Sequence, residues 1–174
     1  MKKILLLVLV IASAFLCACH YGASDAQGEA LTGYGYDAFT EFAESNPYDA
    51  EYNQILKTDE RSISEAAANW LKNWNDEFAY TVAAAEPLFD SADDYDKWES
   101  AMLASLESTN DLYKAQYDCA ITEHIGQMQF HEIKIKHVHA VRDLTLNAKF
   151  FCYILEKEKG VADKDMISIR WYRK

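Results

Sequence analysis

Four of the residues most able to do chemistry lie close together: His124, His131, His137 and His139. In a β-strand, residues an even number of positions apart share a face, so His131, His137 and His139 would lie on one side. A His-x-His pair on such a face suits zinc or copper. In a helix His137 and His139 would point well apart, and no site would form. Two interpretations follow: a zinc or copper site at these three histidines, or separate surface histidines.

The motifs of common enzyme classes are missing from the sequence. It contains no phosphate-binding glycine loop, no G-x-S-x-G elbow and no C-x-x-C pair. His131-Glu132 begins like the H-E-x-x-H zinc motif, but Ile135 occupies the position of the second histidine. Carboxylates are frequent, as in Asp93–Asp96, where they suit the start of a helix. We therefore predict no catalytic residue, no resident cofactor outside the histidine hypothesis, and a protein that is not an enzyme.

The first eighteen residues have the pattern of a secretory signal. Lys2 and Lys3 precede an apolar run that is too short for a comfortable membrane span. The run ends in Leu16-Cys17-Ala18-Cys19, which resembles the lipobox of bacterial lipoproteins. The resemblance implies a signal peptide over 1–18, acylation of Cys19, and anchoring in the cell envelope. His20, rather than Asp, follows the cysteine, which in proteobacteria resembles an outer-membrane address, facing the periplasm. The alternative is cleavage by the ordinary signal peptidase and release as a soluble protein.

Export also bears on the remaining cysteines. Cys17 leaves with the signal and Cys19 is modified, so Cys119 and Cys152 remain. Two thiols in an oxidising compartment most simply form one disulfide. The sequence therefore predicts a Cys119–Cys152 bridge, with two free buried thiols as the alternative.

The charge of the chain is strongly negative and uneven. The full sequence has 28 acidic and 17 basic residues, a net charge of −11. Without the two signal-peptide lysines the net charge becomes −13, with −16 over residues 20–112 and +3 over 113–174. Nucleic-acid binding as the main activity is excluded, because it needs a basic footprint. Long-range attraction instead favours a cationic partner, with simple solubility as the alternative explanation.

The distribution of glycine and proline predicts a tether followed by one helical domain. Four of the six glycines lie at 22–35, so we expect a flexible tether over 19–35. Residues 36–174 hold two glycines and two prolines, which favours long helices. The predicted fold is all-α: a bundle of three to four helices over 36–174, with a short C-terminal strand or extended segment at 166–172.

Apolar residues at helical spacing place three long helices. The first follows a capping box at Ser62–Glu65 and ends before Pro87. The second begins at Ser91 and stops near Gly126; the third covers about 139–159 and is closed by Gly160. Short helical pieces are expected between Asp37 and Lys57.

Residues 127–138 suit either a helix or a strand. If two helices reversed at Gly126, Cys119 would lie about 10 Å from the turn and Cys152 about 39 Å from it. The two cysteines could then not be bridged, because bridged Cα atoms lie within about 7 Å. The open alternatives are a reversal nearer residue 135, an irregular or strand-like 127–138, or no bridge. Of these we favour the irregular or strand-like segment.

Three tryptophans, Trp70, Trp74 and Trp98, lie on the predicted helical stripes. Exposed, they would form a sugar-stacking platform; buried, they would be core. Their regular spacing with Leu71 and Phe78 favours core packing.

One stretch of the chain is similar to a known family. Residues 113–119, Gly126 and Leu144-Thr145 resemble motifs of the lysozyme-inhibitor LprI N-terminal family. Cys152 lies more than three turns beyond the position of that family's second cysteine. The resemblance implies a small helical domain of exported bacterial proteins that binds and inhibits lysozyme-like wall hydrolases. The expected function is accordingly protein binding by a lipid-anchored envelope protein, and the alternative is metal binding through the histidines.

Overall fold

The structure, a computed structural model, describes residues 35–46 and 60–172. The predicted signal peptide, Cys19 and nearly all of the predicted tether lie outside these residues. Within the described part the chain forms four α-helices, α2, α4, α5 and α6, with two short 3₁₀ turns and no strand. The predicted all-α class is therefore confirmed.

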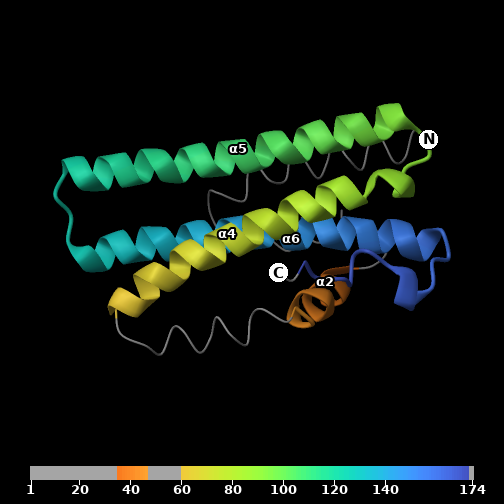
Figure 1. Ribbon diagram of the computed structural model, residues 1–174, viewed down its shortest axis with the longest axis horizontal. Coiled ribbons are helices and arrows are strands. Elements are labelled where there is room, and N and C mark those ends of the chain that lie inside the picture. Colours follow the sequence, from red (N-terminus) through yellow and green to blue (C-terminus); the bar gives the residue numbers. More distant parts are fainter. Residues whose placement is uncertain (1–34, 47–59, 173–174) are drawn as a thin grey trace.

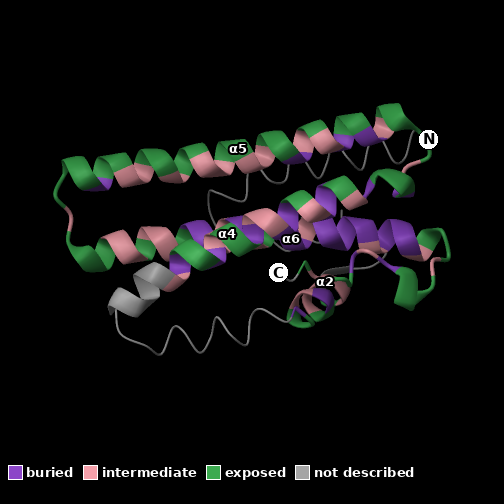
Figure 2. Ribbon diagram, viewed as in Figure 1, coloured by how far each residue is buried: buried purple, intermediate pink, exposed green. Residues whose placement is uncertain are grey.

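Helix α6 (Gln127–Glu158) is the centre of the fold. Helices α4 (Glu60–Ala84) and α5 (Ala92–Thr122) pack on it, and α5 runs antiparallel to it (Figure 1). The short helix α2 (Gly35–Glu44) packs near the carboxyl-terminal half of α6 through Phe42, which contacts Phe150 and Tyr153. Buried residues are concentrated in that half of α6 (Figure 2).

The apolar stripe of α4 forms as its spacing predicts. Every third or fourth residue is buried against the rest of the bundle: Ala67, Trp70, Trp74, Phe78 and Val82. The helix ends before η3 (Glu86–Leu88), which holds Pro87. Its beginning differs from the prediction. The helix begins at Glu60, two residues before Ser62, and the side chains of the predicted capping box at Ser62–Glu65 lie outside the described part of the structure.

Helix α5 begins as predicted, with the Ser91 hydroxyl accepting a hydrogen bond from the Asp94 amide at 3.2 Å. The Tyr95 hydroxyl donates to the Val82 carbonyl at 3.2 Å, which joins α5 to the end of α4. Apolar residues at helical spacing from Tyr95 to Ile125 predict one buried stripe along α5, and this prediction is only half correct. Tyr95 and Trp98 are buried, whereas Ile121 is 64% exposed. The second half of α5 lies beside α6 alone (Figure 1), so part of its apolar surface has no third helix to cover it.

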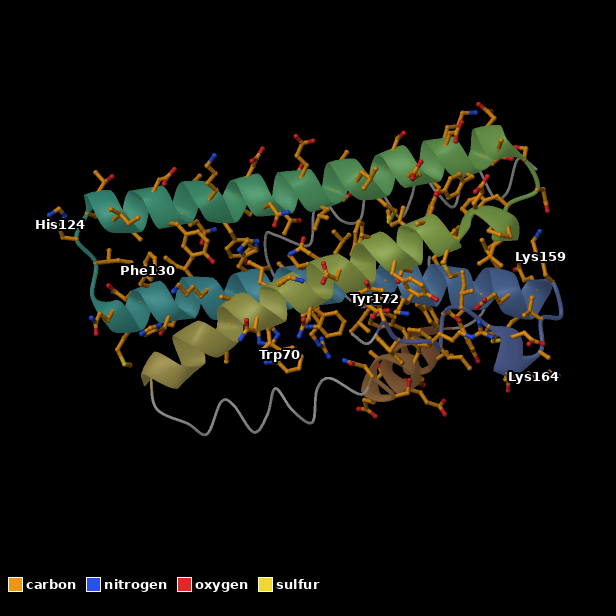
Figure 3. The ribbon with its side chains drawn as sticks, viewed as in Figure 1. Trp70, His124, Phe130, Lys159, Lys164 and Tyr172 are labelled. Atoms are coloured by element: carbon orange, nitrogen blue, oxygen red, sulfur yellow. The ribbon has the colours of Figure 1, made fainter. Side chains whose placement is uncertain are left out.

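The reversal between α5 and α6 lies at residues 123–126. His124 has φ 56°, the left-handed conformation that often ends helices. The amide of Ile125 donates to the Ala120 carbonyl and that of His124 to Ile121, which is the Schellman pattern. From Gln127 onward the chain is helical. The favoured irregular or strand-like reading of 127–138 is therefore wrong, because side chains at helical spacing, among them Phe130 (Figure 3), pack against α5.

This geometry also overturns the predicted disulfide. Cys119 and Cys152 are both free. Cys119 is exposed close to the turn, whereas Cys152 is buried about 26 residues further along α6, near the other end of the hairpin. At 1.5 Å per residue they lie tens of ångströms apart, far beyond the reach of a disulfide.

After α6 the chain turns back along the bundle. Gly160, at φ 69°, takes the glycine position of a second Schellman motif, as predicted, and its amide donates to the Lys157 carbonyl. Following η4 (Asp163–Asp165), residues 166–172 form what we call the C-terminal segment. The strand considered there is absent: the Arg170 amide donates to the Ile167 carbonyl at 3.1 Å, which closes a turn.

Candidate functional site

The structure separates the histidines that the sequence suggested as metal ligands. His131, His137 and His139 all lie on α6. At about 100° per residue, His137 and His139 point about 200° apart. Among residues 35–46 and 60–172, no group of three side chains is arranged to hold a metal ion. The proposed zinc or copper site is thus not formed there, because it required a strand and the segment is a helix.

His137 instead belongs to the interface between α5 and α6. It is buried, and its ring stacks on Tyr113 with centroids 4.6 Å apart. Nε2 lies 2.8 Å from Asn110 Oδ1, and Nδ1 lies 3.2 Å from the Tyr117 hydroxyl. Because the amide oxygen of Asn110 can only accept, Nε2 carries the proton and Nδ1 accepts from Tyr117. Both ring nitrogens are therefore occupied by protein partners.

Burial favours the neutral forms of this cluster. It lowers the pKa of His137, and it raises the pKa of Tyr117 to about 12. At neutral pH the ring is therefore uncharged and the phenol keeps its proton. The cluster fastens the outer half of the hairpin and offers no free nitrogen for catalysis or metal binding.

We expect His137 to make the stability of the protein dependent on pH. Its pKa in the unfolded chain is about 6.5, and burial lowers it in the folded protein. Its contribution is therefore complete above pH about 6.5 and is lost as the pH falls toward the lowered folded value. Urea unfolding between pH 7.5 and 5 should show this loss in the wild type and a shallower slope in His137→Gln.

The matched control for that experiment is His139→Gln, two residues further along the same helix. It removes a histidine of the same helix while leaving His137 and its partners in place. Identical pH slopes in the wild type and His137→Gln would contradict the assignment.

A second polar cluster is fully buried between α4, α6 and the C-terminal segment. Lys149 Nζ forms an ion pair with Glu77 Oε1 at 2.7 Å, and both side chains have 0% exposure. The ammonium group also donates to the carbonyls of Ser168 and Arg170, and it lies 4.4 Å from the centre of the Trp171 ring. Burial lowers the pKa of Lys149, and the nearby Glu77 opposes this shift. The pair is sealed from solvent and fastens the chain end.

The sequence offers no distinctive signal for this cluster. Lys149 lies directly after Ala148 and two residues before Phe151, both on the predicted apolar stripe. Glu77 likewise precedes Phe78. Charged residues adjacent to an apolar stripe are common on amphipathic helices, so only the structure shows that these two are buried and paired with each other.

The two remaining thiols are poor nucleophiles. Burial raises the pKa of Cys152 to about 12, and a hydrogen bond with Glu123 raises the pKa of Cys119. Since the thiolate is the reactive form, neither has the lowered pKa of a catalytic cysteine.

The tryptophans are core residues. Trp70, Trp74 and Trp98 are buried, and Trp98 stacks on Phe151 with centroids 5.6 Å apart. A sugar-stacking platform made of these three rings is excluded, because no sugar could reach them.

The outer face of α5 carries the most distinctive surface chemistry. Its exposed carboxylates repeat at helical spacing, at Asp93, Asp96, Glu107, Asp111 and Asp118. At about 100° per residue they fall within an arc of about 60°, and they extend over about 38 Å of helix. We call these five residues the α5 acidic stripe. Exposed residues run along the whole of this edge of the molecule (Figure 2).

Few basic residues neutralise the α5 acidic stripe. Lys97 pairs with Asp93, and Lys114 is exposed on the same face. Leu103, 48% exposed, lies beside the carboxylates. The face thus combines negative charge with an accessible apolar side chain, which suits contact with a basic protein surface.

No protein-family model, curated protein or solved structure matches the chain. Among the described residues, no helix has the length and apolar content needed to cross a bilayer.

Proposed function

We propose that this protein is a lipid-anchored component of the bacterial cell envelope that binds a cationic protein through the α5 acidic stripe. The observation that carries the proposal is the alignment of five exposed carboxylates on one face of α5. Together with the net charge of the chain, this alignment supports the outer face of α5 as the surface that a cationic protein contacts.

The specific partner we propose is a lysozyme-like wall hydrolase. The resemblance to the LprI family rests partly on residues 113–119, which lie on α5, and Asp118 within them belongs to the stripe. Lysozymes are typically cationic, so charge complementarity supports the same partner. We propose binding rather than catalysis, because the buried ionisable side chains His137, Lys149 and Glu77 are all engaged in holding helices or the chain end together.

Neutralising the stripe should weaken binding of a cationic lysozyme. In the variant Glu107→Gln, Asp111→Asn, Asp118→Asn, three of the five stripe carboxylates are removed without any loss of side-chain volume. We expect the Kd at low salt to rise at least tenfold, because attraction between exposed charges depends on their number and on salt screening. Titration by calorimetry, combined with a lysis assay, measures both binding and inhibition.

A second triple variant separates this face from net charge. Glu132→Gln, Glu158→Gln, Asp165→Asn removes the same charge from exposed positions on α6 and beyond it. Its affinity should stay near that of the wild type. Equal weakening in both variants would mean that only the total charge matters. Absence of binding and inhibition in the wild type at low salt would eliminate the lysozyme proposal.

Lipidation makes a separate prediction. Replacing Cys19 by serine should remove the acyl chain, because the thiol is its point of attachment. We expect incorporation of labelled palmitate to fall to background and the protein to move from the membrane fraction to the soluble fraction. Cys119→Ser is the control, since that residue lies on α5. Unchanged labelling in Cys19→Ser would contradict the anchor.

A further inference from the structure

The C-terminal segment is held by buried side chains that bind its backbone. Glu156 accepts hydrogen bonds from the amides of Ile167 and Ser168, at 2.5 and 3.2 Å, and from the Ser168 hydroxyl. Lys149 donates to the carbonyls of Ser168 and Arg170 at 3.3 and 2.6 Å. These are four main-chain groups of the segment, and the Tyr172 amide is a fifth; all five are paired with charged side chains of α4 and α6.

The last of the five contacts lies at the end of the described chain. The Tyr172 amide donates to Glu77 Oε2 at 2.6 Å, and its ring stacks on Tyr80 with centroids 5.5 Å apart. Tyr172 is labelled in Figure 3, where it lies beside α4. One residue earlier, Trp171 packs edge-on against Trp74. The segment therefore adds two aromatic anchors to its main-chain contacts.

The three charged side chains that make these contacts depend on the segment for their partners. Glu77, Lys149 and Glu156 are each at most 1% exposed when the segment is in place. Removing the segment would take partners from all three charged groups, and buried charges without partners are costly. Most of the hydrogen bonds are to the backbone, so they require few particular side chains: the fully buried Met166, a small residue at 168, and aromatic rings at 171 and 172.

The connection between α6 and the segment is held much less firmly. Residues 158–160 and 162–165 are exposed. The connection is tied to the bundle by exposed ion pairs, Lys157 with Asp163 and Lys159 with Asp90, and such pairs contribute little. The contacts that hold the segment are therefore made by the segment itself and not by the connection that joins it to α6. A segment from another molecule could make the same contacts, as in domain swapping.

We propose that the surface of α4 and α6 that carries Glu77, Lys149 and Glu156 is a peptide-binding site for the C-terminal segment of this chain, and that it accepts this segment from a second copy as well as from its own. The intramolecular arrangement prevails, because the connection after α6 keeps the segment at a high effective concentration near its site. Opening or cutting the exposed connection removes this advantage and makes the site available to a second copy.

The test uses the full chain with a protease site inserted between Ala162 and Asp163. After cleavage, the protein is unfolded and refolded with a fluorescent peptide covering residues 163–174, and bound peptide is measured by polarisation. We expect saturable binding to a helical protein. Introducing Glu156→Gln into the protein should weaken this binding at least tenfold, whereas Glu158→Gln, the same change at an exposed position of α6, should leave it unaltered.

Peptide variants test the same contact without altering the protein. Ser168→Pro removes an amide and a hydroxyl that bond to Glu156, so it should abolish binding. Ile169→Ala, at a position that is 41% exposed, should bind like the parent peptide. The proposal is overturned if the cleaved protein binds no labelled peptide, whether or not it stays helical, or if the Ser168→Pro peptide binds like the parent.

Discussion

Replacing Lys149 with methionine is expected to destabilise the fold by about 3–5 kcal/mol, the usual loss when one partner of a buried ion pair is removed. The substitution roughly preserves the volume of the side chain but leaves the Glu77 carboxylate without its partner at 2.7 Å. It also removes the donor to the carbonyls of Ser168 and Arg170. Urea or guanidinium unfolding followed by circular dichroism measures the change.

Two further variants identify the cause of this loss. Adding Glu77→Gln to Lys149→Met should recover part of the stability, because the unpaired charge is then gone. Lys159→Met breaks the ion pair with Asp90 on the surface and should cost far less. A loss in Lys149→Met no larger than in Lys159→Met would show that the buried pair does not stabilise the fold.

Truncating Trp98 to alanine is expected to cost about 3–5 kcal/mol, the range typical of large aromatic residues in protein cores. The indole is 2% exposed and packs on Phe151 and Phe89, with centroids 5.6 and 5.3 Å away. Its removal leaves a cavity where α5 meets α6. Chemical unfolding with tryptophan fluorescence or circular dichroism measures the effect.

Leu103 on the same helix provides the matched comparison. It is 48% exposed, so Leu103→Ala should change stability by no more than about 0.5 kcal/mol. Because Leu103 lies beside the α5 acidic stripe, Leu103→Ala should instead weaken binding of the cationic partner. If Trp98→Ala proved as mild as Leu103→Ala, the ring would not be part of the core.

Several elements of the fold could be predicted because their causes are local. Ser91 begins α5 and Gly160 terminates α6, since capping depends on residues within one turn. The apolar stripe of α4 became its buried face for the same kind of reason. Where two local patterns competed, as at 127–138, periodicity could not decide between them, and the contacts with α5 did.

The candidate sites were harder to predict, because they depend on which segments meet. The three histidines were close in sequence, but the helix turned His137 toward Asn110 and Tyr117. Conversely, Glu77 and Lys149 are 72 positions apart and form the central pair of the fold. No spacing rule connects residues at that separation.

By itself, the sequence determined the helical class, most helix ends and the uneven distribution of charge, since these follow from local conformational preferences and from composition. Only the tertiary structure decided that Cys119 and Cys152 lie apart, that half of the apolar stripe of α5 stays exposed, and that three buried charges hold the C-terminal segment. Burial and pairing depend on neighbours brought together by packing. A charged side chain in an apolar stripe has no defined role until its partner from another segment is in place.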